Sequence, residues 1–275
     1  MSGSAGVSQP SWQGSAASHP TSTKPARFAL LLILLGLVLG FGWLIVQLLA
    51  YQPPRTHFVL VKTGPIDRLS APPLPFERGT LGRLEVAAAG LRLAGDAVIE
   101  TTLQEASQAI DRLRPEPSDV VLVYVHANGV SAAAKSGRLL TGAFGLSTPQ
   151  EGAILVEDLV QAVANQPASA KVILFDAGRV APDPRRGVLA NRFASAVDAA
   201  VQSADDPSLF AITSHADQQV SGIGQAERCT PLGAAVATSL SGLATDFDGQ
   251  ADEISLADLG AFSLVSVAEA SGGAQ

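Results

Sequence analysis

The stretch KVILFDAGRV, residues 171–180, is an apolar run that ends in an acid and a glycine. A short apolar run bounded by turn-forming residues is typical of a strand that is buried on both faces of a parallel sheet. We therefore expect a strand over residues 171–177. Ligands of such sheets bind beyond the carboxyl ends of the strands, so Asp176 and the residues after it mark the place where a functional site is expected.

The pattern recurs from residue 57 onward, where apolar runs alternate with amphipathic segments. Further strands are expected at 57–61, 119–127 and 208–214. Helical spacing predicts helices at 81–93, 102–113, 156–166, 189–204, 231–244 and 255–270. Thr101 or Thr102 is a candidate cap for the second of these helices. Strands that alternate with helices predict an α/β fold of three layers, with a mostly parallel central sheet covered by helices on both faces.

Composition limits the classes of function that this chain of 275 residues can have. Its formal net charge of −7 argues against a nucleic-acid partner, because such partners require a basic surface. Its single cysteine, Cys229, excludes an internal disulfide framework and a cysteine-based zinc site. The sequence contains neither a phosphate-binding loop nor a Gly-x-Ser-x-Gly elbow, and we expect no metal and no cofactor.

The chain divides by composition into four parts. Residues 1–26 are rich in Ser, Ala, Gly, Pro and Thr, and we expect them to be a disordered tail. Residues 27–51 read as a transmembrane helix, and residues 52–56 as a linker. Residues 57–271 read as one globular domain, since a chain of this length supports one core of good size.

The apolar segment 28–51 contains no charged side chain and would span roughly 35 Å as a helix, enough to cross a bilayer. A cleaved secretory signal is the alternative, but the run is long for a signal and no Ala-x-Ala site follows it. Lys24 and Arg27 flank one end, and Arg55 and Lys62 the other. This balance slightly favours an inside amino terminus, with the globular domain on the non-cytoplasmic side of a single-pass membrane protein.

Three of the expected strands end in polar side chains. In chain order these are His126 and Asn128, then Asp176 and Gly178, then His215 and Asp217. In order and spacing these segments resemble the caspase and metacaspase family of cysteine peptidases. YVHANGV occupies the place of the family's catalytic-histidine segment, and FDAG, whose glycine follows 50 residues after the asparagine, occupies that of Asp-Ala-Cys. SHADQQVS resembles the loop that lines the specificity pocket, and TPLGAAVATSLSGLA resembles the helix after it.

The departures from the family pattern concern the two catalytic positions. Asn128 stands at the histidine position and Gly178 at the cysteine position. Asparagine cannot act as a general base near neutral pH, and glycine offers no nucleophile. The resemblance therefore implies a caspase-like fold in a catalytically degenerate member of the family. We expect a membrane-anchored, non-catalytic binding or regulatory module.

Two carboxylates match the residues that hold a substrate's arginine or lysine in the metacaspase-like branch. These are Asp176 and Asp217, and the resemblance implies that they bind a basic peptide or protein. The alternative is that Asp176 caps nearby backbone N–H groups and that Asp217 is a turn residue.

Other functions remain open at this point. His126 lies on the same strand face as Asn128, and Cys229 could form a dyad with His215, so an active cysteine-type endopeptidase that uses Cys229 is one alternative. A structural or oligomerising domain that forms a homodimer is another. Gly36 and Gly40 have the spacing of paired membrane helices, although glycine is also common in membrane spans. An ordinary flavodoxin-like fold, unrelated to peptidases, is the last.

Overall fold

A computed structural model gives the architecture of the chain, which falls into two compact units, Met1–Pro53 and Pro54–Gln275. The residues that the structure describes are 24–50, 54–63, 74, 77–94, 96–131, 136–141, 152–177, 191–217, 219, 228–242 and 256–270.

The described residues of the first unit form one helix, α1 (Lys24–Ala50). Its segment Phe28–Val46 is long and apolar enough to cross a membrane, by length and composition. Among the described residues no other helix meets both criteria, and a secretory signal near the amino terminus would also meet them. The helix was predicted over 27–51, so its described start lies three residues earlier.

In its described residues, the second unit is built on five parallel strands. They are β1 (Thr56–Lys62), β2 (Ala97–Thr102), β3 (Val120–Val130), β6 (Ala170–Ala177) and β7 (Leu209–Thr213). Their spatial order is β2-β1-β3-β6-β7, the order of flavodoxin-like doubly wound sheets. Two short antiparallel strands, β4 (Arg138–Leu140) and β5 (Ala153–Leu155), continue from the end of β3. The described part of the domain therefore has a sheet of seven strands. The sheet is mostly parallel, as the sequence predicts.

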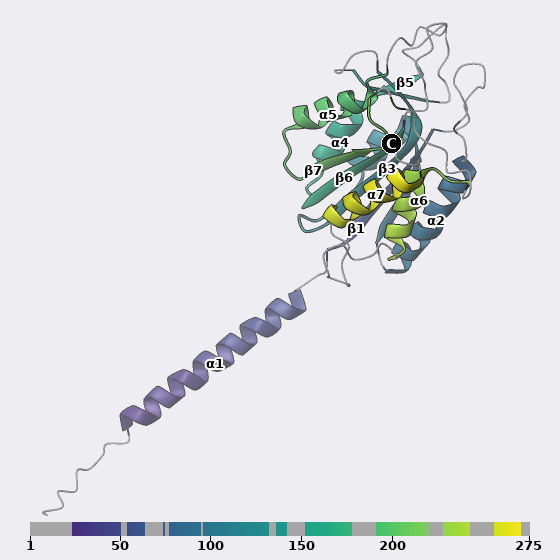
Figure 1. Ribbon diagram of the computed structural model, residues 1–275. Coiled ribbons are helices and arrows are strands. Elements are labelled where there is room, and N and C mark those ends of the chain that lie inside the picture. Colours follow the sequence, from purple (N-terminus) through teal and green to yellow (C-terminus); the bar gives the residue numbers. More distant parts are fainter. Residues whose placement is uncertain are drawn as a thin grey trace, which may run out of the picture. The chain divides into compact units, whose positions relative to one another are not determined.

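Helices cover both faces of this sheet (Figure 1). One face packs against α3 (Ala106–Asp111), α4 (Val156–Ala164) and α5 (Phe193–Ala204). The other packs against α2 (Glu77–Ala94), α6 (Pro231–Leu240) and α7 (Leu256–Ala270). A short 3₁₀ helix, η1 (Leu103–Glu105), precedes α3. The three-layer α/β arrangement agrees with the expectation from the alternating apolar runs.

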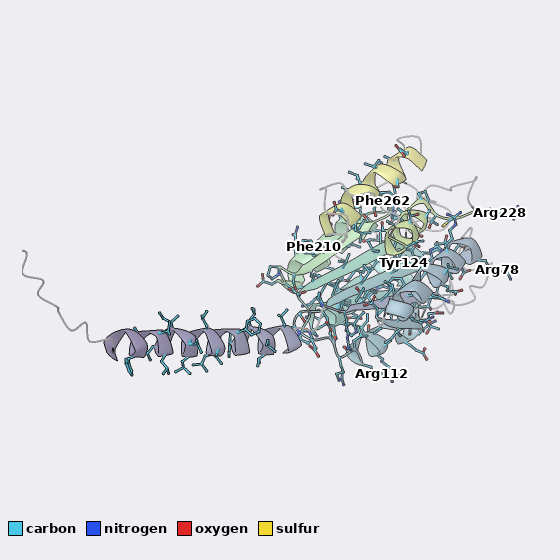
Figure 2. All side chains as sticks on the ribbon, turned by 90° about the horizontal axis from the view of Figure 1, so that it is seen from below. Arg78, Arg112, Tyr124, Phe210, Arg228 and Phe262 are labelled. Atoms are coloured by element: carbon cyan, nitrogen blue, oxygen red, sulfur yellow. The ribbon has the colours of Figure 1, made fainter. Side chains whose placement is uncertain are left out.

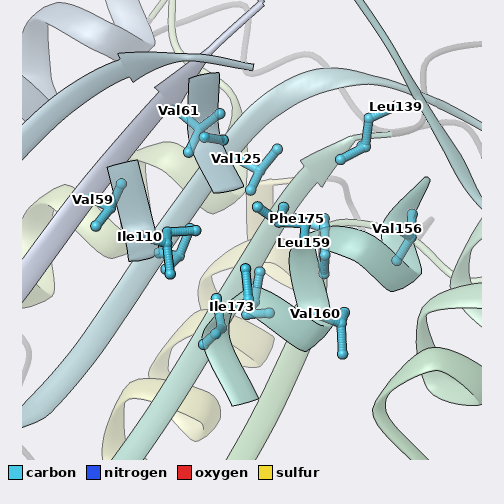
Figure 3. Close-up of a cluster of buried hydrophobic side chains, with 14 of the residues drawn as sticks. Val59, Val61, Ile110, Val125, Leu139, Val156, Leu159, Val160, Ile173 and Phe175 are labelled. Atoms are coloured by element: carbon cyan, nitrogen blue, oxygen red, sulfur yellow. The ribbon is translucent and has the colours of Figure 1, made fainter. Parts of the chain in front are cut away.

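Alternate side chains of the buried strands lie in two separate hydrophobic cores, one on each face of the sheet. On the α3–α5 face, Val125 and Phe175 pack with Leu159 of α4, as Figure 3 shows. On the opposite face, Tyr124 and Leu174 pack among the side chains of α2 and α6. A strand buried on both faces has no polar alternation, which explains why β3 and β6 read as continuous apolar runs.

The structure differs from the sequence-based expectation at β2 and at the helix that follows it. Strand β2 is not among the expected elements, because its side chains are only partly buried and it lacks an apolar run. The helix expected at 102–113 is shorter, and Thr102 makes no side-chain capping bond to the backbone. Its hydroxyl donates instead to Oε2 of Glu105 at 3.2 Å, so the side chain is already engaged.

Candidate functional site

The carboxyl ends of β3 and β6 lie side by side. In the parallel register His126 is opposite Asp176, and Ala127 is opposite Ala177. Asn128, which the resemblance aligns with a catalytic histidine, follows directly and is fully buried. It lies within β3, whose last three residues pair antiparallel with β4, so Asn128 is opposite Leu140. Gly178, which the resemblance aligns with a catalytic cysteine, follows Ala177 in the sequence and lies outside the described residues.

Asp176 is the centre of a buried hydrogen-bond cluster at this end of the sheet. Its Oδ2 atom accepts from the hydroxyl of Tyr124 at 2.6 Å and from the hydroxyl of Thr230 at 2.5 Å. Nδ1 of His126 lies 3.1 Å from the same oxygen. We call Tyr124, His126, Asp176 and Thr230 the Asp176 cluster. All four side chains are buried, and they come from β3, β6 and the start of α6.

The cluster favours a charged Asp176. Burial is the largest influence and works to raise the pKa of the Asp176 carboxyl. The hydrogen bond and charge of His126, with the hydroxyl groups of Thr230 and Tyr124, outweigh burial and hold this pKa below its ordinary value of 3.8. Burial and the nearby carboxylate raise the pKa of Tyr124 well above 10.0, so its hydroxyl keeps the proton that it donates.

Thr230 connects the cluster to two helices. It is the N-cap of α6, and its hydroxyl oxygen accepts from the backbone N–H of Gly233 at 3.2 Å while its proton goes to Asp176. Its own backbone N–H donates to the hydroxyl of Thr80 in α2 at 3.0 Å. The Asp176 carboxylate therefore holds the amino-terminal ends of α2 and α6 to the sheet.

His126 is oriented by the cluster rather than by a nucleophile. Because the Asp176 carboxylate can only accept, Nδ1 of His126 carries the hydrogen of their shared bond. Its Nε2 atom is buried and has no hydrogen-bond partner among the residues that the structure describes. From the sequence, His126 is a fallback candidate for a catalytic residue, and in the structure its ring lies against the Asp176 carboxylate.

Asp217 lies at the amino-terminal end of α5. Its Oδ1 atom accepts from the backbone N–H of Ser195 at 3.0 Å, and its Oδ2 atom accepts from the Ser195 hydroxyl at 2.5 Å. A carboxylate in this place satisfies an unpaired helix N–H and complements the positive end of the helix dipole. Asp217 is only partly buried, so it is the more accessible of the two predicted ligand carboxylates.

His215 follows β7 and packs against an aromatic ring. Its imidazole stacks on Phe193 with ring centres 6.2 Å apart and planes inclined by 11°. Burial lowers the pKa of His215, and the charges of Asp176 and Asp217 only partly oppose this effect. Nδ1 of His215 lies 3.4 Å from the Ser214 hydroxyl, and Nε2 has no hydrogen-bond partner in the described part of the chain.

Cys229 lies in the turn before α6 and is 1 % exposed. The sequence suggests a dyad of Cys229 with His215. The imidazole of His215 lies near the Ser214 hydroxyl and stacks on Phe193, and Cys229 adds to the raised pKa of Tyr124. Within the described residues, no group of three or more His, Cys, Asp or Glu side chains could hold a metal ion.

Two members of the Asp176 cluster, Tyr124 and Thr230, are not among the site residues that the sequence predicts. Tyr124 stands two residues before His126, so strand alternation already places both side chains on one face. Thr230 precedes a proline at the start of a helix, which is a recognisable N-cap pattern, but nothing local indicates its hydrogen bond to a residue 54 positions away.

No protein-family model matches the sequence, and no curated protein matches it.

Proposed function

We propose that this chain is a membrane-anchored, caspase-like domain that binds a protein or peptide without hydrolysing it. The observation that supports this best is the register of β3 and β6, which pairs Ala127 with Ala177, the residues that precede Asn128 and Gly178 in the sequence. A peptidase of this type needs its two catalytic groups at these strand ends, and neither an amide side chain nor a glycine supplies them. In this proposal α1 remains in the membrane and the domain lies on its non-cytoplasmic side.

The hydrogen bonds of the two carboxylates refine the proposed ligand contact. Asp176 already accepts three buried side-chain donors at one oxygen, and a ligand guanidinium would have to disrupt that cluster. Asp217 is partly exposed, and each of its oxygens has one further lone pair for a ligand donor. We therefore assign contact with an arginine or lysine side chain to Asp217, and assign Asp176 to holding the strand ends together.

Calorimetric titration of the full chain in detergent micelles with an arginine-containing peptide tests this function. We expect binding that weakens about tenfold in Asp217→Asn, since a charge-assisted hydrogen bond is replaced by a neutral one. Asp198→Asn is the matched control, because Asp198 is an exposed aspartate on α5, the helix whose start Asp217 contacts, and we expect it to leave binding unchanged. Equal binding of the wild type and Asp217→Asn would contradict the assignment, as would the absence of binding.

The alternative of an active cysteine peptidase depends on the Cys229 thiol. A thiol with 1 % of its residue surface exposed is not presented to a peptide in solution, which weighs against this alternative. A maleimide probe at neutral pH should label native protein slowly and urea-unfolded protein rapidly. Fast labelling of the native chain would support an active cysteine peptidase that uses Cys229.

A further inference from the structure

Both carboxylate oxygens of Asp217 are held by a single residue, Ser195. Oδ1 accepts from the backbone N–H of Ser195 at 3.0 Å, and Oδ2 accepts from the Ser195 hydroxyl at 2.5 Å. Ser195 lies in the first turn of α5, which begins at Phe193, where the backbone N–H groups have no partner within the helix. The two bonds close a ring between Ser195 and Asp217, and this ring fixes the plane of the carboxylate.

The ring determines which lone pairs of Asp217 remain for a ligand. A carboxylate has two lone pairs on each oxygen, and one lone pair of each oxygen points toward the edge that the two oxygens share. The N–H and the hydroxyl of Ser195 are joined by only a few covalent bonds, so both donors approach from the same side and occupy that shared edge. The two lone pairs that remain, one on each oxygen, therefore point in different directions.

The charge of Asp217 is not neutralised by a neighbouring side chain in the part of the domain that the structure describes. No ion pair among these residues joins Asp217 to a basic group. Arg192, the N-cap residue of α5, is exposed, and Arg78 and Arg228 belong to the beginnings of α2 and α6 (Figure 2). His215 is neutral near pH 7, because burial lowers its pKa. A ligand cation can therefore pair with this carboxylate.

We propose that Asp217 binds a lysine ammonium of the ligand in preference to an arginine guanidinium, and that Ser195 determines this preference. The proposal rests on the ligand function proposed above. A guanidinium binds a carboxylate best through two parallel N–H···O bonds, which need the edge shared by both oxygens. At Asp217 this edge is occupied, so a guanidinium reaches one oxygen only. An ammonium is a compact charge with three rotatable donors, and one lone pair is sufficient for it.

Ser195 acts in this proposal as a positioning residue, and its removal should change the preference. Ser195→Ala deletes the hydroxyl and keeps the backbone N–H, so Oδ2 regains its second lone pair and the carboxylate can turn its shared edge toward the ligand. Binding of arginine should then gain about five- to tenfold relative to lysine, which corresponds to one charge-assisted hydrogen bond. A general loosening of α5 would instead weaken the binding of both side chains alike and leave their ratio unchanged.

Calorimetric titration of the full chain in detergent micelles with a matched set of peptides tests the proposal. The peptides are blocked at both ends and differ at one residue, which is lysine, arginine or the neutral arginine analogue citrulline. We expect the wild type to bind the lysine peptide at least as tightly as the arginine peptide, and Ser195→Ala to reverse this order. Ser195→Thr keeps a hydroxyl and should keep the wild-type order. Ser203→Ala is the matched control, because Ser203 is an exposed serine of α5 whose hydroxyl donates to the Ala199 carbonyl within the helix.

The outcomes separate this inference from the ligand function on which it rests. A wild type that binds the arginine peptide more tightly than the lysine peptide would overturn the preference and leave the ligand function in place. The same ratio of affinities in the wild type and in Ser195→Ala, with both proteins folded by circular dichroism, would overturn the role of Ser195. Failure of both charged peptides to bind, or binding of the citrulline peptide as tight as that of the arginine peptide, would overturn the ligand function and this inference together.

Discussion

Nδ1 of His126 lies 3.1 Å from Oδ2 of Asp176, across two adjacent parallel strands and out of contact with solvent. This pair occupies the carboxyl end of the sheet, where an α/β domain usually binds its ligand. Asp176 directs its charge inward, to a histidine and two hydroxyl groups, rather than outward to solvent. We therefore infer a structural role for this pair and assign the proposed ligand contact to Asp217.

Asp176→Asn should destabilise the domain. The carboxamide is neutral, and its single oxygen offers two lone pairs to the three donors from Tyr124, His126 and Thr230, so at least one of them loses its partner. An unsatisfied buried donor next to a lost charge costs about 2 to 4 kcal/mol. The free energy of unfolding in urea is best followed by far-UV circular dichroism, because both tryptophans, Trp12 and Trp43, precede the domain.

Asp217→Asn provides the comparison for that experiment. Its amide oxygen can still accept one hydrogen bond from Ser195, so the loss should be about 0.5 to 1 kcal/mol, as for a weakened helix cap. A loss for Asp217→Asn as large as that for Asp176→Asn would show that the Asp176 cluster is not the main support of this edge.

His215 should make stability depend on pH between neutral and mildly acid conditions. Burial lowers the pKa of His215 in the folded state. Below the ordinary histidine pKa of 6.5, the unfolded chain therefore binds a proton at His215 more readily than the folded chain does. The free energy of unfolding should therefore fall as the pH decreases from about 7.5 to 5.5. His215→Phe keeps the stack on Phe193 and removes the titration, so its decrease over this interval should be smaller. Identical slopes would contradict the assignment.

Gly129→Ala should be destabilising because of a close approach between β3 and α5. A β-carbon at Gly129 would lie 2.7 Å from two ring carbons of Phe193, which is too close for any real contact. Overpacking of this kind costs about 1 to 3 kcal/mol. The double variant Gly129→Ala with Phe193→Leu should recover part of the loss relative to the sum of the two single variants. Strict additivity in thermal unfolding would contradict the contact.

Gly90→Ala should act in the opposite direction. Gly90 lies inside α2, and an added β-carbon meets no atom within 4 Å. Alanine in a helix interior is favoured over glycine by roughly 0.5 to 1 kcal/mol. A rise in the midpoint of thermal unfolding is the expected result, and a decrease would indicate that α2 does not extend through this residue.

The fold follows from the sequence where strands are buried on both faces. The run KVILFDA predicted a strand at 171–177, and β6 spans Ala170–Ala177. Strand β2 was missed because Glu100 and two threonines interrupt its short apolar pattern at the border of the sheet. Strands β4 and β5 have three residues each, too few for a period to be visible. Border and hairpin strands depend on pairing, which a local pattern does not encode.

The site was predictable in position but not in its internal bonds. Because parallel strands end at one edge, His126 and Asp176 could be expected to lie near each other, and they pair in register. The bonds from Thr230 to Asp176 and from Ser195 to Asp217 join residues 54 and 22 positions apart. They depend on how α5 and α6 pack against the sheet, so the chain pattern alone gave no indication of them.

Hydrolysis of arginine- and lysine-containing peptides by the purified full chain, compared with its Cys229→Ala variant, tests the central claim most directly. The account predicts no release of product above the buffer rate for either protein, because neither Asn128 nor Gly178 supplies a catalytic group. Turnover by the wild type that disappears in Cys229→Ala would contradict the proposal that the domain is non-catalytic, since it would show that the Cys229 thiol cleaves peptides.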